Sequence, residues 1–284
     1  MASLFSISKD ATIGATFIGF AASSALFGVM CSQAWTYMNR YPLDRPAYKL
    51  LVAFVWLIEL VDQAFIGHAC YYYTVSGWGN PLVLLKKPVW SLILQVTLGA
   101  IAGGIVKICF AMRVYRFSQR NIPCTAVIII LAVAQLVFAG IYTVEGFRVK
   151  SLTEVDTLKV IGSLSLGLGV ATDICTAAAL CFFLRNLRTG YSKDDSLINR
   201  LTLYAINTGV LTSACSLTAL ILYDIMPGNF IFMAFYFVLT KHYLASGSLW
   251  KFVPSNGSAL EIGIEQEVTI TKDPATRSQY GLAY

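Results

Sequence analysis

The chain has 284 residues, of which 57% are hydrophobic and 13% are charged, and its mean hydropathy is +0.66. A soluble domain carries about 25% charged residues to cover its surface, so the composition excludes a water-soluble globular protein. Two apolar runs, 13–37 and 160–184, contain no Lys or Arg and at most one acidic residue. Each run is long enough to cross a hydrocarbon core of about 30 Å, and we therefore expect an integral membrane protein.

Seven apolar stretches follow one another along the chain and predict an all-α, polytopic membrane protein. Loops rich in Pro, Gly, Asn and charge separate them, and such residues end helices. We predict spans at about 12–38, 48–73, 89–112, 123–144, 158–184, 199–224 and 229–250. The seven spans form one domain over 12–250. A short segment, 1–11, precedes this domain, and we expect a polar, disordered tail over 251–284.

Lys and Arg are distributed unequally between alternate loops. The first, third and fifth loops hold ten of them, against six on the other side before the tail is counted. Cytosolic loops carry the excess of positive charge, so the N-terminus is predicted outside and the C-terminus in the cytosol. The net charge of +6 thus reflects topology. No basic run with interleaved aromatic residues is present, and we expect no nucleic-acid partner.

Several segments resemble a known family of membrane proteins. The most specific part is 188–213, and the other segments are Tyr41-Pro42-Leu43-Asp44-Arg45, His68 with Tyr72, and Arg113-Val114-Tyr115-Arg116. They resemble the seven-span family of unknown function called DUF6534, which is abundant in mushroom-forming fungi. The resemblance covers about 12–250 and implies seven spans and a membrane location. It implies no activity, substrate or catalytic residue.

Ionisable residues inside the predicted spans are the candidate functional groups. Each costs about 2.5–3.5 kcal/mol on insertion scales. At a rise of 1.5 Å per residue, one polar group on each of four helices lies about 12–15 Å from the inner face. Glu59 and Asp62 also share one helical face, because they are three residues apart. We therefore expect a midplane polar site made of Glu59, Asp62, Asp173, Asn207 and Lys241.

Two interpretations of this site remain open at the level of sequence. In the first, Lys241 balances Glu59 or Asp173 in an ion or ligand site; in the second, the same pair locks helices together. Lys107 lies about 8 Å from the inner face, where we expect it to snorkel towards the surface. His68 is expected to be a hydrogen-bonded helix residue rather than a metal ligand.

Motifs of known enzyme classes are absent from the sequence. It contains no His-Glu-x-x-His, no Gly-x-Ser-x-Gly and no Gly-rich phosphate loop outside an apolar helix. Its seven cysteines suggest no disulfide framework. We therefore expect no enzyme, no cofactor and no metal.

Three functional classes fit these features. The first is a receptor-like or sensing protein of the plasma membrane, with a small-molecule ligand outside and a signalling partner in the cytosol. The expected partner contacts are the basic residues Arg113, Arg116, Arg120, Arg185 and Arg188. The second is a proton-coupled small-solute transporter or channel that uses the midplane site. The third is a structural or lipid-organising protein. Short loops, an outer N-terminus and a polar tail favour the first class.

Overall fold

The computed structural model describes residues 10–40, 42, 46–77, 87–118, 120–149, 156–186, 192–226 and 230–245. These residues form seven α-helices and no strand. The helices are α1 (Ala15–Arg40), α2 (Pro46–Tyr71), α3 (Trp90–Phe117), α4 (Ile122–Arg148), α5 (Asp156–Asn186), α6 (Ser192–Ile225) and α7 (Ile231–Ala245). A π-helical turn, η2 (Asp10–Gly14), precedes α1, and a second, η3 (Tyr72–Ser76), continues α2. The predicted tail, 251–284, lies outside the described residues.

Five helical segments are long and apolar enough to cross a membrane. They are Thr12–Arg40, Pro46–Ser76, Trp90–Phe117, Ile122–Arg148 and Leu158–Phe183. The described apolar parts of α6 and α7, Gly209–Ile225 and Ile231–Lys241, are shorter. The all-helical class predicted from the sequence is therefore confirmed, and the five segments identify an integral membrane protein.

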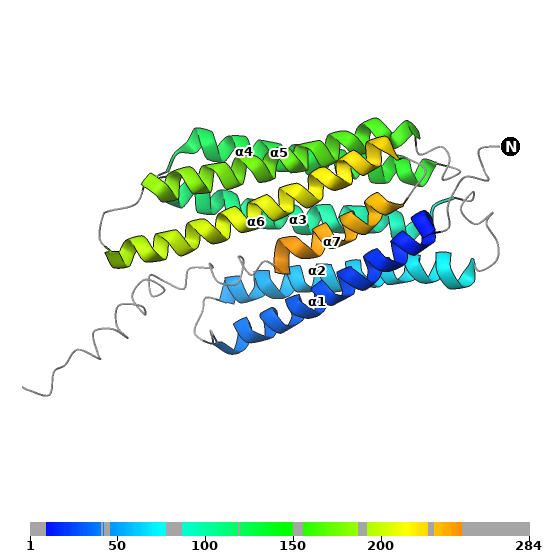
Figure 1. Ribbon diagram of the computed structural model, residues 1–284, viewed down its shortest axis with the longest axis horizontal. Coiled ribbons are helices and arrows are strands. Elements are labelled where there is room, and N and C mark those ends of the chain that lie inside the picture. Colours follow the sequence, from blue (N-terminus) through cyan, green and yellow to red (C-terminus); the bar gives the residue numbers. More distant parts are fainter. Residues whose placement is uncertain are drawn as a thin grey trace, which may run out of the picture.

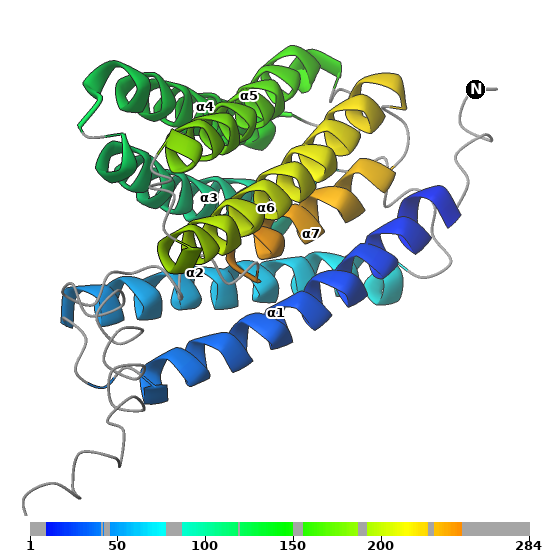
Figure 2. The ribbon, with the colours of Figure 1, turned by 60° about the vertical axis from the view of Figure 1, so that its left-hand side comes forward.

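The helices form a bundle in which α7 returns to the first helix. Each helix packs against its successor in the chain, and α7 packs against α1, which closes the ring (Figures 1 and 2). The third helix contacts α2, α4, α5 and α7, so it connects the two halves of the bundle. Polar groups on α3 can therefore reach partners from either half.

Small residues let α7 approach its neighbours closely. A Cβ atom added to Gly19 on α1 would lie 2.5 Å from the Cα atom of Ala234 on α7. A Cβ atom added to Gly99 on α3 would lie 2.7 Å from the Cγ2 atom of Thr240. Both distances are too short for real contacts, so the position of α7 depends on these two glycines, as in other close helix pairs of membrane proteins.

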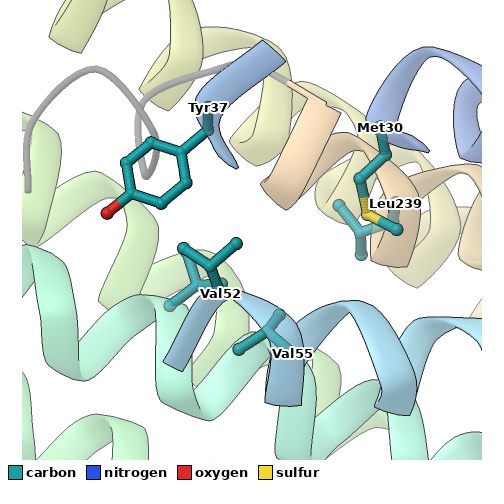
Figure 3. Close-up of a cluster of buried hydrophobic side chains, with 6 residues drawn as sticks. Met30, Tyr37, Val52, Val55 and Leu239 are labelled. Atoms are coloured by element: carbon teal, nitrogen blue, oxygen red, sulfur yellow. The ribbon is translucent and has the colours of Figure 1, made fainter. Parts of the chain in front are cut away.

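Two apolar clusters lie at successive levels along α2. The first cluster comprises Met30, Tyr37, Val52, Val55, Val106 and Leu239, from α1, α2, α3 and α7 (Figure 3). The second cluster comprises Ile66, Ala69, Tyr73, Val89, Leu92 and Phe237. Along α2, the first cluster ends at Val55 and the second begins at Ile66. The candidate site occupies the helix between them.

Candidate functional site

One buried stripe of α2 changes from apolar to acidic at its centre. Its members are spaced alternately by three and four residues, so they lie on one face of the helix. They are Val52, Val55, Glu59, Asp62, Ile66 and Ala69. The two carboxylates therefore replace apolar residues at the positions that face the inside of the bundle.

Lys241 on α7 binds both carboxylates. Its Nζ atom donates to Glu59 Oε2 at 2.6 Å and to Asp62 Oδ2 at 2.7 Å. It also contacts the backbone oxygen of Glu59 at 3.2 Å. All three side chains are fully buried, with 0% exposure. We call Glu59, Asp62 and Lys241 the Lys241 cluster. It ties α7 to α2 across the bundle.

Each carboxylate of this cluster uses one oxygen and leaves the other unpaired. Glu59 Oε1 and Asp62 Oδ1 are buried, and neither has a hydrogen-bond partner in the described structure. The next residue of α2, Gln63, also has a buried oxygen, Oε1, without a hydrogen-bond partner. Its Nε2 atom donates to Ser24 Oγ at 2.8 Å. Buried acceptors without donors are costly. An unpaired oxygen on each carboxylate therefore distinguishes this cluster from an ion pair in which every polar atom has a partner.

Apolar side chains adjoin the Lys241 cluster on both sides along the bundle. Val55 lies one turn before Glu59, and Ile66 lies one turn after Asp62; both are fully or almost fully buried. The ring of Phe27 on α1 adds a third apolar neighbour, 5.8 Å from Lys241 Nζ. In such surroundings the effective dielectric constant is low, so charges of the cluster interact strongly with one another.

A second buried lysine, Lys107 on α3, joins three consecutive helices. Its Nζ atom donates to Gln135 Oε1 on α4 at 2.6 Å and to the backbone oxygen of Gly169 on α5 at 3.2 Å. It lies 3.2 Å from Asp173 Oδ1, also on α5, and the two side chains are 3% and 5% exposed. We call Lys107, Gln135 and Asp173 the Lys107 cluster. Lys107 points into the bundle and does not snorkel as expected, because a carboxylate and an amide inside the bundle bind its amine.

The structure divides the predicted midplane layer between these clusters. It brings Glu59, Asp62 and Lys241 together, and it pairs Asp173 with Lys107. The two clusters also lie at different levels along the bundle. Gly99 packs beside Thr240, the neighbour of Lys241, and Lys107 follows eight residues later on α3, which corresponds to about 12 Å.

Asn207 lies outside both clusters. It is exposed on α6, although its expected depth had placed it in the midplane layer. The depth of a residue along its helix does not determine the direction in which its side chain points. Asn207 is therefore not a part of the site as the structure shows it.

Several of the predicted cytosolic contact residues lie near helix ends. Arg116 and Arg120 are exposed near the end of α3, and Arg185 is exposed near the end of α5. Arg113 is half-buried, and its guanidinium carbon lies 5.3 Å from the centroid of the Phe110 ring. Arg188 falls outside the described residues. Arg116, Arg120 and Arg185 are therefore accessible to a partner.

Two polar side chains, Gln135 and Ser91, form hydrogen bonds that the sequence did not predict. Gln135 was missed because a single uncharged polar residue in an apolar span is a weak signal. Ser91 is fully buried, and its Oγ atom shares a hydrogen bond of 2.8 Å with Nδ1 of His68. His68 is thus hydrogen-bonded, as expected. The described part of the chain contains no group of three or more His, Cys, Asp or Glu residues placed to hold a metal ion.

Comparison with known proteins identifies one family. The model of a family of unknown function, DUF6534, matches residues 169–247. The match supports membership of the DUF6534 family. The region matched by DUF6534 runs from α5 to the end of α7 and contains Asp173 and Lys241, one member of each buried cluster. No curated protein and no solved structure matches the chain.

Proposed function

We propose that the chain is a receptor-like or sensing protein with seven membrane spans, in which the Lys241 cluster holds α7 against α2. The double bridge from Lys241 to Glu59 and Asp62 carries this proposal. A receptor needs an element with two arrangements whose balance a ligand can shift. A helix that closes the ring and is held across the bundle by one buried side chain is suited to that role.

The proposed topology places the N-terminus outside and the C-terminus in the cytosol of a plasma-membrane, multi-pass protein of fungal type. The unequal distribution of Lys and Arg between alternate loops supports this orientation. With this orientation, the exposed residues Arg116, Arg120 and Arg185 lie on the cytosolic side. They are the proposed contacts for a signalling partner, whereas a small-molecule ligand would bind nearer the opposite ends of the helices.

A transport assay tests this proposal. The full-length protein is reconstituted in proteoliposomes, and proton, ion and solute flux is measured between about pH 5 and pH 8. A sensing protein is expected to give no flux. Flux in the wild type that disappears in Glu59→Gln or Lys241→Met, while both variants remain folded, would overturn the sensing proposal.

The second candidate is a proton-coupled transporter or channel for a small solute. It is favoured by one observation: the Lys241 cluster holds two carboxylates for one amine, and it leaves an oxygen of each carboxylate unpaired. Ionisable groups at such positions mark ion and proton pathways in many membrane proteins. The same flux assay decides between the two candidates. A structural or lipid-organising protein is the third candidate, for which substitutions in the cluster would change stability alone.

A further inference from the structure

The Lys241 cluster contains one positive and two negative side chains in their charged forms. The three side chains are fully buried, and along α2 the two carboxylates lie between two apolar clusters. The surplus is one negative charge. An unpaired charge in a membrane interior is strongly unfavourable, so a compensating positive charge would stabilise the folded protein.

Lys241 cannot supply that compensation alone. An ammonium group has three N–H donors, and those of Lys241 are directed at Glu59 Oε2, Asp62 Oδ2 and the backbone oxygen of Glu59. Glu59 Oε1 and Asp62 Oδ1 are left without a donor. The charge surplus and the unpaired atoms therefore occur on the same two side chains.

We propose that the Lys241 cluster binds one monovalent cation, a proton or a sodium ion, at the unpaired oxygens of Glu59 and Asp62. Carboxylate oxygens bind hard cations, and a proton converts such an oxygen into a donor. Gln63 Oε1 adds a neutral unpaired oxygen on the same face of α2. A single positive charge makes the cluster neutral, whereas a divalent ion would leave a positive surplus.

Three other basic side chains, on α1, α2 and α3, do not neutralise the Lys241 cluster, because they lie elsewhere along their helices or bind other groups. On α3, Lys107 lies eight residues, or about 12 Å, further along the helix than Gly99, and it binds Asp173. On α1, Arg40 is the last residue of the helix. On α2 itself, the ring of His68 is bonded to Ser91.

The polar side chains of Tyr236, Gln63 and Asp224 carry no positive charge. Tyr236 on α7 donates its hydroxyl hydrogen to the backbone oxygen of Val96 at 3.3 Å. Gln63 bonds to Ser24 on α1. On α6, which packs against α7, Asp224 lies in the last turn and accepts from Ser163 on α5. Within the described structure, a small cation is therefore the simplest source of the missing charge.

Along α2, apolar residues precede and follow the two carboxylates, so the proposed cation would be enclosed by apolar side chains on both sides along this helix. A bound cation would relieve repulsion between Glu59 and Asp62 and so stabilise the contact between α2 and α7. This inference does not depend on the proposed function, because a sensor and a transporter could each use the same site.

The test measures the midpoint of thermal unfolding, Tm, of the full-length protein in lipid nanodiscs. In one arm, choline chloride is replaced by sodium chloride at constant ionic strength and constant pH. In the other arm, the pH is varied between about 5 and 8 without sodium. We expect Tm to rise by about 2–4 °C in one arm. A rise with sodium identifies a sodium ion, and a rise as the pH falls identifies a proton.

Variants connect the effect to the unpaired oxygens. Asp62→Asn and Glu59→Gln each remove the surplus charge, and we expect either variant to lose the cation dependence. Asp173→Asn is the matched control, because it neutralises a buried carboxylate of the Lys107 cluster; its cation dependence should equal that of the wild type. If the variants do not fold, the change of the wild-type Tm in the two arms decides whether the cluster binds a cation.

Two results would overturn the proposal. One is a wild-type Tm that changes in neither arm. The other is a cation dependence that Asp173→Asn abolishes while Asp62→Asn and Glu59→Gln retain it, since the effect would then originate outside the Lys241 cluster.

Discussion

The two buried lysines have similar exposure but different partners. Lys107 binds one carboxylate, one amide oxygen and one backbone oxygen, and its cluster is neutral when both charged groups are ionised. Lys241 binds two carboxylates, and its cluster carries a surplus negative charge. The comparison shows that burial of a lysine alone says little about its role. The number of acidic partners decides whether a cluster is balanced or needs a further cation.

The helices that the clusters connect also differ. The Lys107 cluster joins α3, α4 and α5, which are consecutive in the chain and pack along one another. The Lys241 cluster joins α2 to α7, the last helix of the ring. Loss of the first cluster should therefore loosen one layer of neighbouring helices, whereas loss of the second should release α7.

The largest effect is expected for Lys241→Met. This substitution leaves two carboxylates buried together without a positive partner, and breaking a buried ion pair costs about 3–5 kcal/mol of unfolding free energy. Lys107→Met removes the lysine from a single carboxylate, Asp173, and should cost less. Reversible unfolding in nanodiscs or mixed micelles measures both values. Equal losses, or a larger loss for Lys107→Met, would contradict the difference between the clusters.

Neutralising a whole cluster should recover much of that loss. The triple variant Lys241→Met, Glu59→Gln and Asp62→Asn replaces the ion cluster with neutral side chains, an exchange that is often close to neutral for stability. We expect it to regain at least about 2 kcal/mol of unfolding free energy relative to Lys241→Met. If the triple variant is as unstable as the single variant, the lost stability resides in packing by the lysine chain and not in charge.

The sequence predicted the seven helices and the shared face of Glu59 and Asp62 correctly, because both depend on local periodicity. Depth was less predictable. The predicted span 89–112 placed Lys107 near the inner face, but α3 continues to Phe117. Lys107 is therefore ten residues, or about 15 Å, from the end of the helix, and its amine binds groups inside the bundle.

Partner choice was the part of the site that the sequence could not determine. Asp173 and Glu59 are both buried acids in neighbouring parts of the bundle, and either was an acceptable partner for Lys241. The choice depends on how α2, α3, α5 and α7 are rotated and staggered, which no single helix encodes. Gln135 became a partner for the same reason, since its side chain reaches Lys107 through the packing of α4 against α3 and α5.

A smaller effect is expected for Gln135→Leu. The variant removes the closest acceptor of the Lys107 amine, and a hydrogen bond to a charged group contributes about 1.5–3 kcal/mol. Hydrogen exchange measured by mass spectrometry should show faster exchange in α3, α4 and α5, with α7 unchanged. Faster exchange in α7 as well would mean that the two clusters are coupled and do not act as separate units.

The smallest loss of stability is expected for Gly19→Ala, which tests how the contact between α1 and α7 positions α7. Gly19→Ala places a Cβ atom against the backbone of Ala234, and overpacking of this kind costs about 1–3 kcal/mol. Gly28 on the same helix is the matched control, because a Cβ atom there meets nothing within 4 Å, and Gly28→Ala should be neutral or stabilise the helix by up to about 1 kcal/mol. Since displacement of α7 moves Lys241 but not Lys107, Gly19→Ala should accelerate hydrogen exchange in α7 and leave α4 and α5 protected. Equal behaviour of the two alanine variants would show that α7 keeps its place through the Lys241 cluster alone.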